Sequence, residues 1–141
     1  MGRRRLAREA VLQALYLADV STTPAAEAYE GIIRGFSDLD EKSEKFGLEL
    51  VEGAALHRDA IDDALQATAD NWELKRMTAV DRNILRMASY ELLHNAETPV
   101  SVVIDEALEI AKKYSSDDSP GFINGILDKI KNKRPAEPKA Q

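Results

Sequence analysis

The sequence of 141 residues contains no cysteine. Without cysteine the chain can form no disulfide framework, no thiolate metal site and no cysteine nucleophile, which fits a reducing cytoplasm. No apolar run approaches the ~18 residues needed to span a bilayer, and the N-terminus lacks the apolar core of a secretory signal. We therefore expect a cytoplasmic protein that has no segment in the membrane.

Sequence motifs typical of enzymes are also missing. The chain has no G-x-x-x-x-G-K, G-x-S-x-G or G-x-G-x-x-G pattern. Its two histidines, His57 and His94, fall near the ends of different predicted helices, without the spacing of a metal site. The acidic cluster of Asp59, Asp62 and Asp63 is typical of a solvated helix surface. The sequence thus predicts no enzyme, no cofactor and no metal ion.

The residues that are present favour one all-α domain. Hydrophobic residues make up 44% of the chain and charged residues 31%, as in a soluble globular protein. Apolar residues recur every three or four positions, which predicts amphipathic helices. The predicted helices, about seven in number, cover approximately residues 4–19, 24–36, 41–54, 61–68, 79–92, 100–111 and 120–130.

Two stretches need interpretation beyond this pattern. Residues 100–104 favour a strand by propensity, but no second strand is available to pair with them, so we assign them to the start of a helix. Asn71 and Trp72 end the first half of the chain, and we place a subdomain divide near residues 70–77, with Trp72 in the core between the halves. Residues 131–141, which include Pro135 and Pro138, are predicted to form a disordered basic tail after a domain of residues 1–130.

Charge is distributed unevenly along the chain, whose formal net charge is −6. Residues 1–8 carry +4 and residues 129–141 carry +4, so residues 9–128 sum to −14. Solubility does not explain cationic ends on an acidic body, since either sign alone would supply it. A cationic patch that leads into a helix bearing Tyr16 is typical of a surface that binds phosphate backbone and stacks bases. A solvated, frayed basic terminus is the alternative.

Four blocks of sequence, in matching order and spacing over residues 3–130, resemble the NusB family of bacterial transcription antitermination factors. The blocks are Arg3–Tyr16; Trp72–Met77 with Asp81–Arg86 and Ser89–Leu92; Pro99 with Ile104–Ala107 and Ala111–Tyr114; and Phe122–Asp128. Any one block would be a weak signal, but together they are specific. Residues 22–70 add little, because they read as generic helix.

The resemblance implies a fold of two packed three-helix subdomains and a function in transcription. Proteins of this family pair with NusE, a ribosomal protein, and the pair binds a short single-stranded RNA element called boxA. With other Nus factors they join elongating RNA polymerase and oppose termination, notably in ribosomal RNA operons. We therefore expect boxA-type RNA, NusE and the RNA polymerase elongation complex as partners.

Candidate RNA-binding residues follow from this resemblance and from their chemistry. Cationic side chains suit phosphate contacts, and exposed aromatic side chains suit the splayed bases of single-stranded RNA. Arg86 is either part of the RNA surface or a buried ion-pair residue, and Tyr16 and Phe122 are either RNA contacts or core residues. The candidates are Arg3, Arg4, Arg5, Arg8, Tyr16, Arg86, Tyr114 and Phe122 for RNA, with Asp81 and Arg82, at a helix start expected to be exposed, for NusE.

Two other functions remain open on sequence alone. A helical adaptor that binds only proteins could use its arginines on an acidic partner. A small helical enzyme would require a metal-dependent activity for which the sequence gives no motif. The sequence does not distinguish a monomer from a homodimer.

Overall fold

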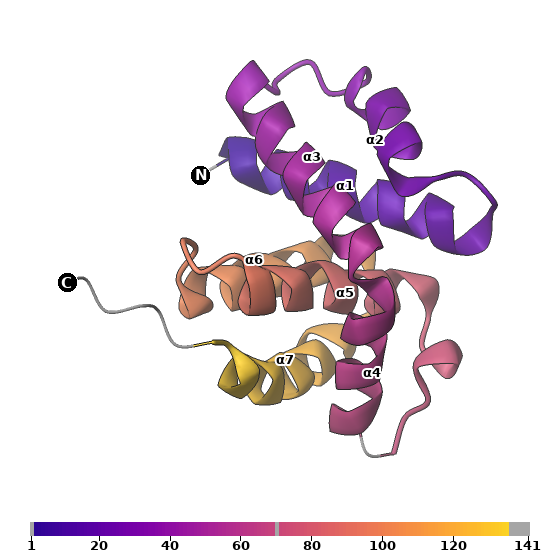
Figure 1. The fold of residues 1–141 in the computed structure, drawn as a ribbon, viewed down its shortest axis with the longest axis vertical. Coiled ribbons are helices and arrows are strands. Elements are labelled where there is room, and N and C mark those ends of the chain that lie inside the picture. The colour runs from indigo at the N-terminus through magenta and orange to yellow at the C-terminus, as the bar shows by residue number, and fades with distance from the viewer. Residues whose placement is uncertain (1, 70, 136–141) are drawn as a thin grey trace.

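A computed structural model of the chain describes residues 2–69 and 71–135. Within these ranges it consists of α-helices and short 3-10 turns and contains no strand (Figure 1). The all-α prediction is therefore confirmed for the described residues. The elements are α1 (Gly2–Val20), α2 (Ala25–Ile33), α3 (Glu41–Leu56), α4 (Arg58–Thr68), η1 (Leu74–Arg76), α5 (Ala79–His94), α6 (Val100–Tyr114), α7 (Ser119–Ile130) and η2 (Lys131–Lys133).

Local side-chain chemistry fixes where several helices begin. The Asp40 carboxylate accepts a hydrogen bond from the Ser43 backbone N–H (2.8 Å) and caps α3, while the Thr78 hydroxyl accepts one from the Asp81 N–H (3.1 Å) and caps α5. The strand-prone residues 100–104 form the first turns of α6, directly after Pro99. They are helical because Val103 shares one buried face with residues 107, 110 and 111 of the same helix.

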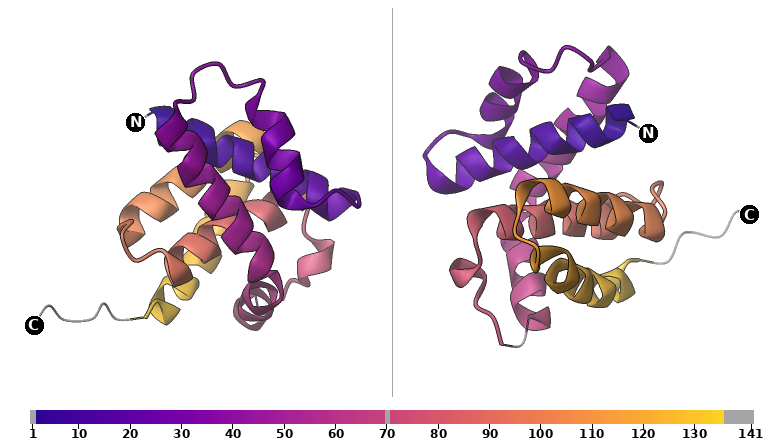
Figure 2. Two further views of the ribbon diagram at one scale, coloured as in Figure 1. Left: turned by 45° about the horizontal axis from the view of Figure 1, so that its top comes forward. Right: turned by 180° about the vertical axis from the view of Figure 1, so that it is seen from behind.

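The central element of the fold is α5. Its residues 83–89 are all buried, because α5 packs against α1, α3, α4, α6 and α7. Figure 2 shows α5 and α6 lying between the α1–α3 layer and α7. A helix that is enclosed on so many sides must bury polar residues as well as apolar ones, and the buried part of α5 includes Arg86 and Glu91.

The helices form two groups, and the chain passes from the first to the second at His57. The first group is α1, α2 and α3, which pack on one another, and the second contains α5, α6 and α7. Helix α4 joins the second group because it packs on α5 and α7, although Figure 1 shows it continuing down from α3. The chain therefore passes from one group to the other at His57, whereas the predicted divide lies near residues 70–77, of which Leu74–Arg76 form the 3-10 turn η1.

The C-terminal segment is more ordered than the sequence predicts. Residues 131–133 form η2, and the Arg134 guanidinium donates to the carbonyls of Leu92 (2.7 Å), Asn95 (2.7 Å) and Thr98 (2.7 Å). These bonds satisfy carbonyl groups at and beyond the end of α5. Of the tail predicted at 131–141, residues 136–141 lie outside the described residues.

Helix α3 approaches α2 closely at Gly47. A Cβ atom at this position would collide with the ring of Tyr29, whose hydroxyl donates to the Glu44 carbonyl (2.7 Å). Gly47→Ala should therefore lower the free energy of unfolding by roughly 1–3 kcal/mol, the usual cost of overpacking. Urea denaturation measures the change.

Gly125→Ala in α7 is the matched control, since a Cβ atom there meets nothing within 4 Å. It should be neutral or raise the free energy of unfolding by up to about 1 kcal/mol, because alanine favours helix more than glycine does. Equal effects of the two substitutions would contradict the close packing of α3 on Tyr29.

Candidate nucleic-acid interface

The first two of the four N-terminal arginines lie at the surface. Arg3 forms an exposed ion pair with Asp40, with Nη1 2.7 Å from Oδ2. This interaction and the cap bonds of Ser43 lower the pKa of Asp40 to about 2, the Ser43 bonds being the larger cause. The Arg4 guanidinium lies 4.6 Å from the centre of the Phe46 ring and makes a cation–π contact. Both side chains are accessible to an anionic ligand.

The other two arginines are held by carboxylates, Arg5 in a partly exposed ion pair and Arg8 in the interior. Arg5 donates two hydrogen bonds to Glu106 of α6 (3.0 and 2.6 Å), which lower the pKa of that carboxyl group. Arg8 donates two to Glu91 of α5 (2.7 and 2.8 Å), and the side chains of Arg8 and Glu91 are only 3% and 1% exposed. The expectation that Arg8 contacts phosphate does not match this position, because its guanidinium is enclosed and already paired.

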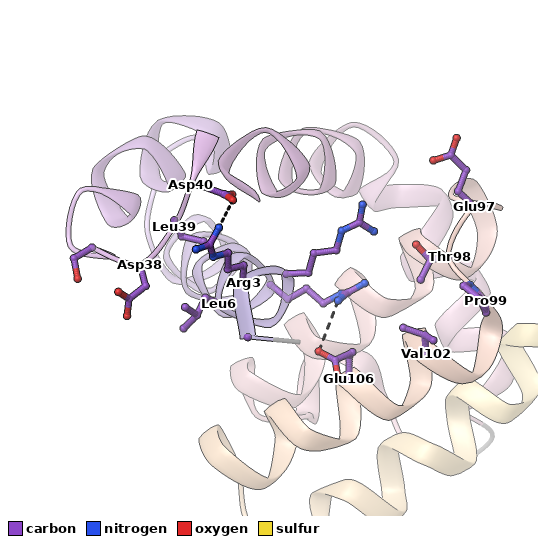
Figure 3. Close-up of a pocket in the computed structure, with 14 residues that line it drawn as sticks. Arg3, Leu6, Asp38, Leu39, Asp40, Glu97, Thr98, Pro99, Val102 and Glu106 are labelled. Carbon is purple, nitrogen blue, oxygen red and sulfur yellow. Dashed lines mark hydrogen bonds and ion pairs between the residues drawn. The ribbon is translucent and has the colours of Figure 1, made fainter. Parts of the chain in front are cut away.

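A groove of about 1020 Å³ lies beside the start of α1 (Figure 3). Its walls come from α1, the loop before α3, and the start of α6 with the loop that precedes it. Figure 3 shows Arg3 paired with Asp40 on one side and Glu97, Thr98 and Val102 on the other. The groove mixes cations with several carboxylates, so its cationic character is concentrated at the start of α1.

Tyr16 does not lie in the core. Its side chain is 39% exposed and lies near two other exposed apolar residues of α1, Leu17 and Val20, which are 40% and 53% exposed. Tyr16 and Leu17 line a shallow apolar groove together with Val80. This exposed apolar patch, Tyr16, Leu17 and Val20, is of the kind that marks a protein contact.

The two aromatic residues that flank the loop of residues 115–121 differ in their surroundings. Tyr114 packs on α1, where its hydroxyl donates to Glu9 (2.7 Å) and accepts from Gln13 (3.3 Å). Burial and the Glu9 carboxylate raise the pKa of Tyr114. Phe122 is half-buried and meets the edge of Trp72, with ring centres 5.5 Å apart. Trp72 is 56% exposed, so its expected place in the core between subdomains is wrong.

Arg86 is a buried ion-pair residue, one of the two alternatives from sequence. Its guanidinium, 7% exposed, donates to both oxygens of Asp62 (2.8 and 2.9 Å) and to Asp19 (3.1 Å). Burial alone would raise the pKa of Asp19, but hydrogen bonds from Arg82 and Asn83 and the charge of Arg86 outweigh it and lower that pKa. The cluster connects the end of α1 to α4 and α5, and it leaves Arg86 unavailable to RNA.

The start of α5, where Asp81 and Arg82 were expected to face NusE, is not an exposed surface. Asp81 is 9% exposed and accepts hydrogen bonds from the hydroxyls of Ser115 (2.5 Å) and Ser119 (2.9 Å). Arg82 donates to Asp19 (2.8 Å) and to the Met77 carbonyl (2.9 Å). Both side chains hold neighbouring elements together, and Asp81 fixes the loop that precedes Phe122.

Sequence reasoning missed a second cationic segment on α3. Lys42 and Lys45 are exposed and line one groove with Arg4, Phe46 and His94. The occurrence of Lys42, Lys45 and Phe46 within five residues of one helix was a readable signal, but only the packing of α3 beside α1 shows that they join Arg4. His94 also stacks on His57 with ring centres 4.2 Å apart, although the two histidines belong to different elements.

Within residues 2–69 and 71–135, no group of three or more histidine, aspartate or glutamate side chains could hold a metal ion. None of the helices in these ranges combines the length and apolar character needed to cross a bilayer.

The fold and its surface define a class: a helical protein with exposed cationic side chains at the start of α1 and along α3, and with the exposed Trp72 ring against Phe122 of α7. The particular family follows from comparison with known proteins. The model of the NusB family matches residues 5–132, and the chain belongs to this family.

Relatives match over nearly their whole length. The chain is 49% identical over 136 residues to the transcription antitermination protein NusB of Elusimicrobium minutum, covering 95% of this chain and 96% of that protein. The structure resembles NusB of T. maritima at 36% identity, with a TM-score of 0.86 over 93% of this chain and 92% of the other. It also resembles a chain in a structure of the antitermination factors NusB and NusE in complex with dsRNA (TM-score 0.85, 23% identity, 94% and 98% coverage), which shows the shared fold.

The buried position of Arg8 predicts an effect on stability. Arg8→Ala leaves the Glu91 carboxylate buried without its ionic partner, so the free energy of unfolding should fall by roughly 3–5 kcal/mol. Arg4→Ala, one helical turn earlier and exposed, should cost less than about 1 kcal/mol, the scale of an exposed cation–π contact. Chemical denaturation of both variants makes the comparison, and similar losses would show that the Arg8–Glu91 pair does not hold α1 on α5.

Proposed function

We propose that this protein is a cytoplasmic transcription antitermination factor. It binds boxA-type single-stranded RNA together with NusE and joins elongating RNA polymerase with other Nus factors, notably on ribosomal RNA operons. The observation that carries the proposal is the end-to-end similarity to proteins named for transcription antitermination, at 49% identity for the relative in Elusimicrobium minutum. That name describes a regulator of transcription and not an enzyme.

The surface of α1 supports RNA binding in physical terms. Arg3 and Arg4 are exposed and can exchange their contacts for phosphate oxygens, whereas Arg5 and Arg8 are held by Glu106 and Glu91. Phosphate contacts position a strand but carry no sequence information. Selectivity for boxA must therefore come from groups that contact bases.

The Trp72–Phe122 pair is the best candidate for such a group. Both rings line a surface pocket of about 340 Å³, and Trp72 is 56% exposed. Aromatic faces bind unstacked bases of single-stranded RNA. Asp81 supports this pocket from behind through Ser115 and Ser119, which fix the start of α7 and hence Phe122.

A protein partner such as NusE suits the apolar patch of Tyr16, Leu17 and Val20 better than it suits Asp81 and Arg82. The patch is exposed and adjoins a shallow apolar groove, whereas the side chains of Asp81 and Arg82 are engaged inside the protein. The structurally similar NusB chain was solved as a complex of NusB and NusE with dsRNA. We place NusE on this side of α1.

The decisive experiment is a titration of labelled boxA-type RNA into the protein with and without saturating NusE. Residues 9–128 carry a net charge of −14, which repels the phosphates of an RNA strand. NusE should therefore tighten RNA binding by roughly 5- to 150-fold, the usual range of coupling between two ligands. By reciprocity, RNA should tighten NusE binding by the same factor. Equal affinities in both titrations would reduce the two proteins to independent binders.

The same titration, repeated at several salt concentrations, distinguishes an RNA-binding protein from an adaptor that binds only proteins. An RNA-binding protein should lose affinity with rising salt, by about 0.7 log units per log unit of salt for each phosphate neutralised. Arg3→Ala with Arg4→Ala should flatten this slope by about 1.4. An adaptor that binds only proteins would show no RNA affinity even at low salt.

Phe122→Ala tests base contact at the aromatic pair. Stacking contributes about 1–3 kcal/mol per base, so boxA binding should weaken roughly 5- to 150-fold while binding of an unrelated strand changes less. Phe36→Ala is the matched control, because Phe36 is also half-buried but lies between α2 and α3. Loss of thermal stability without selective loss of boxA affinity would assign Phe122 to the core.

A further inference from the structure

A groove separate from the Trp72–Phe122 pocket lies between α3, the start of α1 and the end of α5. Its volume is about 420 Å³, and it adjoins the larger groove of Figure 3, with which it shares Arg4, Glu97 and Thr98. The cationic and aromatic side chains that line it are Arg4, Lys42, Lys45, Phe46, Tyr90 and His94.

The three cations of this groove form no ion pair with a carboxylate of the described residues. Among the described residues, no carboxylate forms an ion pair within 4.0 Å of Arg4, Lys42 or Lys45. Most other cations of the described ranges have such a partner, as Arg3, Arg5, Arg8, Arg58, Arg82, Arg86 and Lys113 do. Two exposed carboxylates, Glu49 and Glu97, also line the groove, which leaves a net charge of +1 with His94 neutral. The groove is therefore locally cationic on an acidic protein.

Aromatic rings line the same groove. The Phe46 ring carries Arg4 above it, at 4.6 Å from its centre. The Tyr90 and His94 rings stack at 5.2 Å, and His94 continues onto His57 at 4.2 Å. Gly53 of α3 leaves room for this stack of three rings, because a Cβ atom at that position would collide with the Tyr90 ring.

We propose that this groove is a binding surface for single-stranded RNA, with phosphates on Arg4, Lys42 and Lys45 and a base stacked on Phe46 or His94. Unpaired cations beside aromatic rings are the combination that holds single strands. The proposal rests on the proposed function and extends it: a strand that reaches Arg3 and Arg4 continues along α3 and does not turn toward Arg5 and Arg8. Helix α3 thus supplies phosphate contacts in place of the buried Arg8 and of Arg5, which is paired with Glu106.

The first test removes the two lysines. Lys42→Gln with Lys45→Gln should weaken binding of a labelled boxA-type RNA about 10-fold and flatten the salt slope by about 1.4, as expected for two lost phosphate contacts. Lys75→Gln with Lys112→Gln is the matched control, because these lysines are also exposed but lie on η1 and α6, outside the groove. The control makes the same change in net charge and should leave the slope unchanged.

The second test follows the histidines directly. The chain has two, His57 and His94, so their imidazole protons give two assignable NMR signals. Addition of boxA-type RNA should shift the His94 signal in the wild-type protein and in the Lys75/Lys112 control. If RNA binds without any shift of the His94 signal, and the salt slope of the Lys42/Lys45 variant is unchanged, the proposal that RNA binds in this groove is wrong.

The outcomes also separate this inference from the proposed function. If the wild-type protein and the Lys42/Lys45 variant bind RNA equally well, RNA does not bind in the groove, while the proposed antitermination role stands. If the wild-type protein fails to bind RNA at about 50 mM salt with NusE present, both the RNA-binding groove and the proposed function are wrong. If a polyglutamate peptide shifts His94 and RNA does not, the groove takes an acidic peptide and the RNA assignment is wrong.

Discussion

The buried ion pair between Arg8 and Glu91 is the interaction on which the rest of the structure depends. It joins α1, which organises α2 and α3, to α5, which organises α4, α6 and α7. Two charges that are almost fully enclosed are tolerated only because each satisfies the other through two hydrogen bonds. Such a pair has one workable geometry, so it sets how the two helical groups meet and which residues of α1 remain at the surface.

The same constraint explains the distribution of free charge. Arg5 follows Arg8 into the interior side of α1 and meets Glu106, whereas Arg3 and Arg4 remain outside. At the other end of α1, Asp19 gathers Arg82 and Arg86. Several carboxylates of the acidic segment 9–128 are therefore engaged in ion pairs with arginines. Arg4 at the start of α1 and Lys42 and Lys45 on α3 form no ion pair with a carboxylate of the described residues.

Much of the fold was predictable, and the candidate site was predictable only in part. The Val100–Ile104 run was correctly assigned to a helix, because its continuation carries a clear helical period and no partner strand exists. Asp40 and Thr78 are residue types that cap helices, so the starts of α3 and α5 also depend on local sequence. Charge patterning found the arginines as a group but treated them as equivalent, and it gave no sign that Trp72 is exposed or that His57 and His94 stack.

The sequence by itself determined the helices, their approximate ends, the cationic N-terminus and the family, since all of these depend on residues close together or on motifs in a fixed order. Tertiary structure decided which arginines are available, that α4 packs with the second helical group, and that Lys42 and Lys45 lie beside Arg4. The reason is that burial and ion pairing depend on residues far apart in the chain: Arg8 and Glu91 are separated by 83 positions. A helical period shows that two residues share a face, but the neighbour that packs on that face decides whether a charge meets solvent or a partner.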